Sequence, residues 1–163
     1  MSIAYLLLGG NLGDRKANME KAVTLLQTNA GEVIEKSSLY ESEPWGFDDV
    51  HAFYNQAVAI ETSLNPYELL DEIHIIENEL GRIRQSQQYA SRTMDIDILF
   101  YDNKVIASER LTIPHLQLPN RRFVLEPMNE LNPSLVHPLL NKSMAQLLDN
   151  CPDTKLVKAI MEN

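Results

Sequence analysis

Apolar and polar positions along the chain form a pattern that predicts four strands and two long helices. Strands are expected over 3–8, 33–42, 53–61 and 94–101, where apolar or alternating runs are bounded by turn residues. Helices are expected over 14–29 and 65–80, each with an apolar face and a glycine close to its end. Asn65, Pro66 and Glu68 give the second helix the residues typical of an N-cap, a first turn and a capping box.

The order of these elements, β-α-β-β-α-β, predicts an α+β fold. This order is the signature of a ferredoxin-like βαββαβ core, an antiparallel sheet with helices packed on it. A short apolar segment at 105–106 and weaker helical patterns at 121–126 and 143–150 follow this core. The chain has 163 residues and neither an internal repeat nor a linker, so a single domain over 1–163 is expected.

Composition is typical of a globular protein. Hydrophobic residues make up 44% of the chain and charged residues 23%, which argues against disorder, collagen or a coiled coil. Cys151 is the only cysteine, so neither a disulfide framework nor a thiolate metal cluster is expected. No apolar run approaches ~20 residues and no basic stretch opens the chain. We therefore expect no membrane span, no signal peptide and a cytoplasmic protein.

The charge is unevenly distributed along the sequence. The formal net charge is −9, which argues against nucleic acid or an anionic membrane as a partner. Six of the seven arginines nevertheless fall within 82–122, a segment that contains seven basic and four acidic residues. The remainder holds seven basic and 19 acidic residues. This distribution indicates a local site for a small polyanion inside an acidic exterior, although arginines also cluster on solvated surfaces.

Two carboxylates stand out in the strand expected over 94–101. Side chains alternate in a strand, so Asp95 and Asp97 share one face and Ile96, Ile98 and Phe100 the other. Paired oxygen ligands about 7 Å apart at their Cα atoms suit Mg²⁺ that keeps its other positions for water and phosphates. A solvent-facing polar strand gives the same pattern, and nucleotide-sugar transferases and phosphatases also use D-x-D. The nearby arginines favour phosphate chemistry.

Other candidate groups carry weaker signals. His74 and Glu77 lie three residues apart on the polar side of a helix, which is typical of a solvated surface. They would reach a ligand only if this helix flanked the site. His115 follows a proline in a loop, and a lone histidine is more often structural. Cys151 has no adjacent base, so a thiol nucleophile is not expected.

A glycine-rich segment at 9–13 follows the first strand and is expected to form a loop. It matches neither G-x-x-x-x-G-K-[ST] nor G-x-G-x-x-G, so a nucleotide cradle is not predicted. A turn near the site, where glycine is needed for positive φ, is the better interpretation.

Three motifs together resemble the 6-hydroxymethyl-7,8-dihydropterin pyrophosphokinase family. They are R-T-M-D-I-D-I-L at 92–99, R-L-T-I-P-H at 110–115 and N-R-R-F at 120–123, and the resemblance covers about 3–137. It implies transfer of pyrophosphate from ATP to the hydroxymethyl group of the reduced pterin, leaving AMP, in folate biosynthesis. The resemblance implies that the small-molecule partners are ATP and 6-hydroxymethyl-7,8-dihydropterin. It also implies that two Mg²⁺ ions bound with ATP are the cofactors. A monomer is expected.

The resemblance also assigns roles to residues. It implies metal ligation by Asp95 and Asp97, and catalytic roles for Arg82, Arg92 and Asp97. The ATP contacts it implies are His74, Glu77, Arg84, Tyr89, Arg92, Ile98, Arg110, Thr112, His115 and Arg121. The pterin contacts it implies are Ser42, Glu43, Trp45, Phe53, Asn55 and Phe123. Two aromatic rings suit a flat heterocycle, and an amide suits its edge because it offers both a donor and an acceptor.

The chain departs from the family pattern in two loops. Gln88, Tyr89, Ala90 and Ser91 replace residues common in relatives, as do His74 and Glu43, which puts loop closure and nucleotide affinity in doubt but not the reaction class. Two other functions stay open from sequence: a catalytically silent nucleotide- or pterin-binding module, and an interaction protein whose acidic exterior binds a basic partner.

Overall fold

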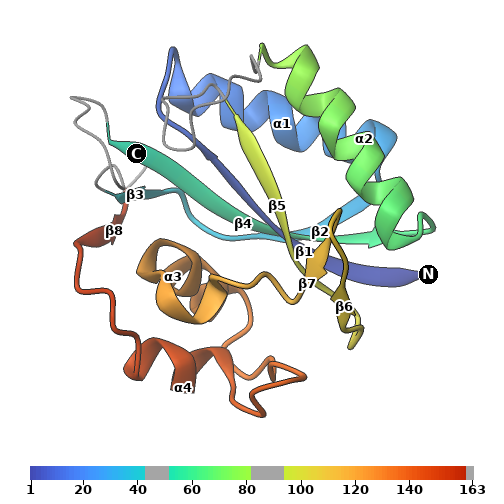
Figure 1. Ribbon diagram of the computed structural model, residues 1–163. Helices are drawn as coiled ribbons and strands as arrows, with labels where there is room; N and C mark the ends of the chain where they lie inside the picture. Colours follow the sequence, from blue (N-terminus) through green and yellow to red (C-terminus); the bar gives the residue numbers. More distant parts are fainter. Residues whose placement is uncertain (43–51, 82–93, 161–163) are drawn as a thin grey trace.

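Short and long strands together form one antiparallel sheet in the computed structural model (Figure 1). The structure describes residues 1–42, 52–81 and 94–160. The strand order is β5-β1-β4-β3-β8, and β2 pairs with another part of β4. Their bounds are β1 Ser2–Gly10, β2 Glu32–Lys36, β3 Tyr40–Ser42, β4 Phe53–Thr62, β5 Asp95–Tyr101 and β8 Val157–Ala159. A separate two-stranded sheet pairs β6 (Ile106–Ala107) with β7 (Thr112–Ile113). The predicted α+β fold with helices packed on an antiparallel sheet is confirmed.

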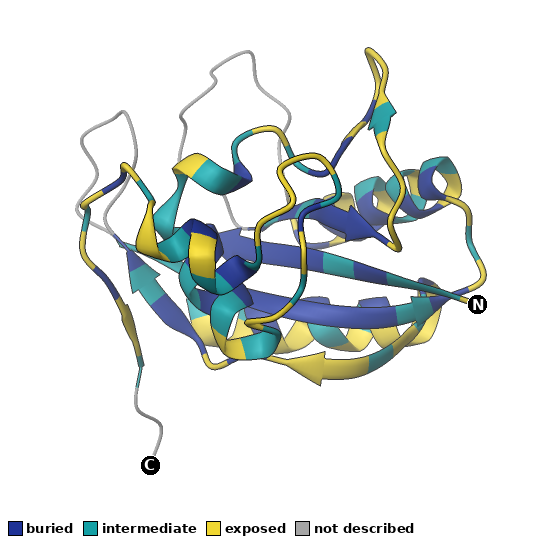
Figure 2. Ribbon diagram, turned by 90° about the horizontal axis from the view of Figure 1, so that it is seen from below, coloured by how far each residue is buried: buried dark blue, intermediate teal, exposed yellow. Residues whose placement is uncertain are grey.

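Helices cover both faces of the sheet. The helices α1 (Arg15–Asn29) and α2 (Pro66–Glu79) lie on one face, and α3 (Arg122–Leu131) and α4 (Met144–Asp149) on the other (Figure 1). Central strand β1 therefore faces apolar side chains on both sides. Leu6 and Leu8 pack towards α1 and α2, and Leu7 packs towards α3 and α4. Figure 2 shows the buried residues concentrated along the central strands.

The starts of α1, α2 and α4 follow the local cap chemistry. Asn65 accepts the amide hydrogen of Glu68, and Glu68 accepts that of Asn65, so the predicted capping box is present at α2. Asp14 caps α1 by accepting the amide hydrogen of Ala17, and α4 begins after Ser143, which forms a capping box with Gln146, within the predicted 143–150. None of the helices in the described ranges combines the length and the apolar character that crossing a bilayer requires.

The strand predicted over 33–42 is two strands. Ser37 separates β2 from β3: its amide donates to the carbonyl of Ala57, and its hydroxyl accepts the amide hydrogen of Ala57. Its own carbonyl accepts the side-chain amide of Gln56 at 2.7 Å. Because one serine uses both backbone and side chain on β4, the regular ladder is interrupted here and resumes at Tyr40.

The predicted face of Phe100 is wrong, and a β-bulge is the reason. Tyr5 pairs with Phe100 and Leu6 pairs with Ile98, so Leu99 is an extra residue opposite β1. The bulge turns Phe100 to the α3 side, where it packs with Leu7, while Ile98 stays on the α1 and α2 side. Tyr5 meets the Phe100 ring edge-on at 6.3 Å.

Three further differences lie at the ends of elements. The predicted loop at 9–13 starts later, because Gly9 and Gly10 still pair with β4 at Asn55 and Tyr54. Helix α3 continues past the predicted 121–126, and Pro127 lies inside it. Its apolar face keeps packing onto the sheet after the proline, which compensates for the backbone hydrogen bond that proline removes. Strand β8 was not expected and extends the sheet beyond β3.

Candidate active site

A cleft runs along the free edge of β5, between α2 and the segment 110–116. Its volume is about 370 Å³. The strand β5 supplies its floor, because β5 is the outermost strand and no neighbour pairs with its second edge in the described sheet. The cleft is lined by Leu70, His74, Glu77, Asp95, Ile96, Asp97, Ile98, Arg110, Leu111, Thr112, His115 and Leu116. Eight residues to which the resemblance of the motifs assigned a role are therefore brought together here.

The two strand carboxylates share a face, as the alternation predicts. Asp97 lies opposite Leu7 and Asp95 opposite Gly9 in the pairing with β1, and Leu7 faces α3. Both aspartates are partly exposed, whereas Ile96 between them is buried. Among the described residues, no group of three or more His, Cys, Asp or Glu side chains is arranged to hold a metal ion. Asp95 and Asp97 both line the cleft, and one or two carboxylates together with phosphates are the donor set that suits Mg²⁺.

Glu77 is a structural part of the cleft wall. It is only 2% exposed, so its sequence-based interpretation as part of a solvated helix surface is wrong. Its Oε2 accepts the amide hydrogen of Ile96 at 2.8 Å. The amide of Ile96 therefore points away from β1, and because amides two residues apart in a strand point the same way, that of Ile98 does so too. The helix α2 thus flanks the site, and His74 one turn earlier lines the cleft with it.

The opposite wall carries Arg110 and Thr112. The Arg110 guanidinium forms an ion pair with Asp71 of α2 and lies 5.7 Å from the centre of the Tyr67 ring. Thr112 belongs to β7, whose pairing with β6 fixes this wall. The ion pair is half exposed, so its contribution to stability is small and its main effect is to hold the guanidinium at the cleft.

His115 lies at the junction of the cleft and α3. Its backbone amide donates to the carbonyl of Leu99 at 3.0 Å, and its Nδ1 accepts the amide hydrogen of Gln117 at 3.2 Å. The neutral ring therefore carries its proton on Nε2 and offers a donor there. Burial lowers the pKa of His115 below 6.5, the positive charge of Arg121 lowers it further, and Asp95 opposes this shift.

Arg121 and Phe123 flank the first residue of α3. The guanidinium of Arg121 lies 5.7 Å from the centre of the Phe123 ring. Phe123 is partly buried and packs against the apolar residues beneath α3. Through these neighbours, the start of α3 connects the cleft to the sheet face that carries the two aspartates.

Several predicted pterin contacts occupy that same sheet face. Asn55 lies opposite Gly9 in the β1–β4 pairing, and Ser42 lies opposite Phe53 in the β3–β4 pairing. The hydroxyl of Ser42 donates to Oδ1 of Asn55 at 3.1 Å, and both residues are buried. The face therefore runs from Asn55 on β4, across Gly9 on β1, to Asp95 on β5.

The sequence pattern predicts a turn at 9–13 near the site but assigns Gly9 no role in it. A Cβ atom placed on Gly9 would lie 2.6 Å from Nδ2 of Asn55, closer than real Cβ contacts come. The bare backbone of Gly9 is therefore what allows the Asn55 amide to lie over β1. A glycine inside a strand pattern often marks such a close approach, so the signal was present in the sequence. Leu70, Leu111 and Leu116, which also line the cleft, carry no comparable sequence signal.

Six predicted site residues lie outside the described residues. They are Glu43, Trp45, Arg82, Arg84, Tyr89 and Arg92.

Comparison with known proteins identifies the chain. The sequence model of the 7,8-dihydro-6-hydroxymethylpterin-pyrophosphokinase (HPPK) family matches residues 5–133. The fold, the cleft and this match define an enzyme, a pyrophosphokinase. The chain belongs to the HPPK family, whose activity serves folate biosynthesis, and the resemblance found in its motifs is confirmed.

Individual relatives match over most of the chain. The 2-amino-4-hydroxy-6-hydroxymethyldihydropteridine pyrophosphokinase of Bacillus subtilis is 46% identical over 131 residues, covering 80% of this chain and 78% of the relative. That of Haemophilus influenzae is 39% identical over 159 residues, covering 97% and 98%. The folic acid synthesis protein fol1 of Schizosaccharomyces pombe is 41% identical, and the match covers 92% of this chain but only 20% of fol1.

A solved structure shares the fold. Plasmodium falciparum HPPK-DHPS, in a crystal structure with pterin and p-hydroxybenzoate, superposes with a TM-score of 0.73 at 21% identity. The match covers 91% of this chain and 41% of that protein. The chain thus spans less than half the length of this structural relative.

Proposed function

We propose that the chain transfers pyrophosphate from ATP to the hydroxymethyl group of 6-hydroxymethyl-7,8-dihydropterin, giving the pterin diphosphate and AMP. The hydroxyl oxygen attacks the β-phosphorus in line and gives up its proton to solvent, the bond from that phosphorus to the α,β-bridging oxygen breaks, and AMP leaves with that oxygen. No covalent enzyme intermediate is formed. The observation that carries this proposal is the pair Asp95 and Asp97 on one sheet face, between the β5 cleft and Asn55 on the same face.

The two carboxylates fit Mg²⁺ because they are partly exposed oxygen ligands that line a polar cleft. When bound with ATP, two such ions would neutralise charge on the phosphates and support the attacking oxygen. We assign Asp97 as the acidic residue nearest the attacking hydroxyl group of the pterin. Positioning and charge neutralisation supply most of the acceleration in such phosphate transfers, so the residues act mainly by binding and orienting.

The cleft supports an ATP site along the edge of β5. The outward backbone amide of Ile98 offers a donor to a flat base, and leucines line the walls beside it. His74, Arg110, Thr112 and His115 supply polar groups on both walls. Guanidinium groups suit phosphate oxygens because their forked donors match them, and this argument extends to the predicted contacts Arg84, Arg92 and Arg121. Arg82 and Arg92 are the two that we assign to catalysis.

The pterin site follows from the sheet face around Asn55. Its Oδ1 already accepts the Ser42 hydroxyl, so the amide is held in one orientation and can present both a donor and an acceptor to a heterocycle. Phe53 shares the sheet face of Asn55, and Phe123 belongs to α3, which packs over that face; this arrangement supports their assignment to the flat ring of the pterin. Trp45 and Glu43 complete the set that we propose. We also propose that the enzyme is cytoplasmic, since one cysteine suits a reducing compartment, and that it acts as a monomer.

A coupled assay of AMP release tests the proposal. The purified chain is incubated with ATP and Mg²⁺, with and without the hydroxymethyl pterin. We expect AMP only when the pterin is present, and loss of AMP release when a chelator removes Mg²⁺. Hydrolysis of ATP without pterin, or tight binding of both substrates without AMP release, would contradict the proposal.

A further inference from the structure

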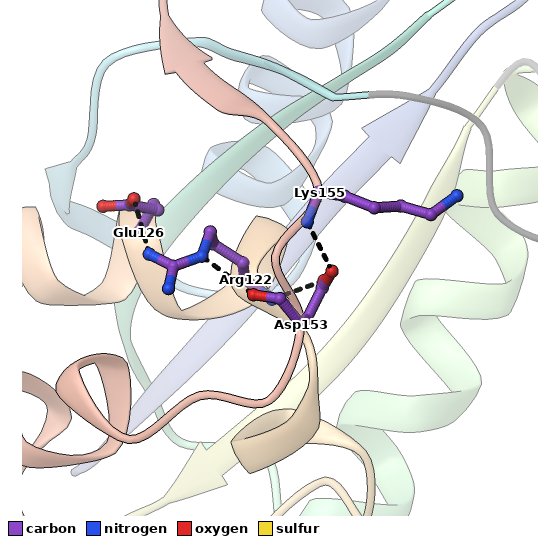
Figure 3. A network of polar contacts seen from close by, with 4 residues as sticks. All are labelled: Arg122, Glu126, Asp153 and Lys155. Atoms are coloured by element: carbon purple, nitrogen blue, oxygen red, sulfur yellow. Dashed lines mark hydrogen bonds and ion pairs between the residues drawn. The ribbon is translucent and has the colours of Figure 1, made fainter.

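The start of α3 takes its N-terminal cap from a distant part of the chain. The N-cap residue is Arg121, whose guanidinium cannot accept a hydrogen bond, and it makes no side-chain cap. Asp153 instead accepts the amide hydrogen of Arg122 through Oδ2 at 3.0 Å (Figure 3). The other α-helices of the described chain are capped by the residue directly before them, which is Asp14, Asn65 or Ser143.

Asp153 is itself fixed in position. Its Oδ1 accepts the amide hydrogen of Lys155 at 2.9 Å, and its backbone carbonyl accepts Nε–H of Arg122 at 3.0 Å. The Arg122 guanidinium also contacts Glu126 at 3.3 Å (Figure 3). Asp153 is only 7% exposed, and its negative charge is favoured by the partial positive charge at a helix N-terminus. Two hydrogen bonds thus tie the tail to the first residue of α3.

The residue that Asp153 holds lies between two predicted ligand contacts. Arg121 directly precedes Arg122, and its charge reaches His115 in the cleft. Phe123 directly follows Arg122 and packs beneath α3. Because the peptide units joining these residues are planar and the helix begins here, a movement of the Arg122 backbone displaces both neighbours. Asp153 also lies beyond residue 133, where the match to the sequence model of the family ends.

We propose that Asp153 is a positioning residue for the pyrophosphokinase reaction. It sets the start of α3 so that Arg121 faces ATP and Phe123 faces the pterin at the same time. It acts through the Arg122 amide and is not assigned any contact with substrate. This inference rests on the proposed function.

Steady-state kinetics of the full chain test the role. We expect Asp153→Ala to raise KM for the pterin and KM for ATP about tenfold each, equivalent to about 1.4 kcal/mol. We expect kcat to stay within about twofold, since the carboxylates of β5 are unchanged. Asp153→Asn keeps a side-chain carbonyl that accepts the Arg122 amide hydrogen, so it should return both KM values to within about threefold of wild type.

Ser143→Ala is the matched control. It removes a cap of the same kind from α4, where Ser143 accepts the amide hydrogen of Gln146. We expect it to lower the urea midpoint about as much as Asp153→Ala while leaving both KM values unchanged. Unchanged KM values in Asp153→Ala, equal KM changes in both alanine variants, or no rescue by Asp153→Asn would overturn the proposal. If the wild-type chain releases no AMP, the proposed function fails, and calorimetric dissociation constants for ATP and pterin still decide the positioning role.

Discussion

Replacing Gly9 by alanine changes one atom at the centre of the proposed pterin site. The added Cβ would lie 2.6 Å from Nδ2 of Asn55, whereas ordinary contact begins at 3.4 Å, so the amide has to retreat by about 0.8 Å. The next atoms are 3.7 Å and 3.8 Å away and belong to Tyr54 and Asn55. The backbone of Gly9 lies in a strand and has no positive φ, so alanine introduces no backbone strain there, and the contact with Asn55 is the main perturbation.

The magnitude follows from the contacts of Asn55. Its hydrogen bond with Ser42, 3.1 Å long, breaks when the amide retreats, at a net cost of about 1 kcal/mol. Reduced freedom of the unfolded chain returns about 0.4–1 kcal/mol, so the free energy of unfolding changes by less than about 1 kcal/mol. Two misplaced hydrogen bonds to the pterin, at about 0.5–1.5 kcal/mol each, raise its Kd about 5- to 150-fold.

Isothermal titration calorimetry separates this effect from a general loss of structure. Pterin affinity is measured in the presence of a nonhydrolysable ATP analogue, and the affinity of the analogue is measured alone. We expect only the pterin affinity of Gly9→Ala to fall. Gly31→Ala is the control: its Cβ would meet the carbonyl oxygen of Glu61, so it should lower stability without changing either affinity. Wild-type pterin affinity in Gly9→Ala, or equal losses for both ligands, would refute the reasoning.

Three further predictions concern the cleft. Alanine at Asp97 should lower kcat for AMP release by several orders of magnitude at saturating Mg²⁺, and near-wild-type turnover would contradict the metal role. Glu77→Ala leaves the buried amide of Ile96 without this acceptor, so we expect urea unfolding to show that the free energy of unfolding falls by about 1–3 kcal/mol. Glu77→Gln keeps a carbonyl acceptor, so its free energy of unfolding should fall less. Equal losses in the two variants would argue against a stabilising role for this hydrogen bond. Burial and Arg121 hold the pKa of His115 below 6.5, so as the pH falls the unfolded chain takes up this proton first. The contribution of neutral His115 to stability is complete above pH 6.5, and it is lost as the pH falls from 6.5 through the lower pKa that His115 has in the folded state. The urea midpoint should therefore drop on going from about pH 7.5 to about pH 5.5, and drop less in His115→Gln; the same drop in both proteins would show that His115 does not contribute.

Local patterns in the sequence determined most of the framework. The alternation of β5 placed Asp95 and Asp97 on one face, because side chains two residues apart in a strand point the same way. The start of α2 followed from Asn65 and Glu68, because a capping box involves residues only three positions apart. The motifs at 92–99, 110–115 and 120–123 were sufficient to identify the family, although the sequence could not place their side chains around a cleft.

Contacts between distant residues were decided only by the tertiary structure. The bulge at Leu99, which turns Phe100 to the opposite face, depends on how β5 pairs with β1 and leaves no periodic signal in sequence. The sequence pattern indicates that Glu77 is a solvated helix residue, whereas in the structure α2 packs beside β5 and buries Glu77 against the amide of Ile96. Asp153 caps a helix 31 residues away in sequence. Periodicity and capping rules act within a few residues, whereas these contacts exist only once the sheet and its helices have packed.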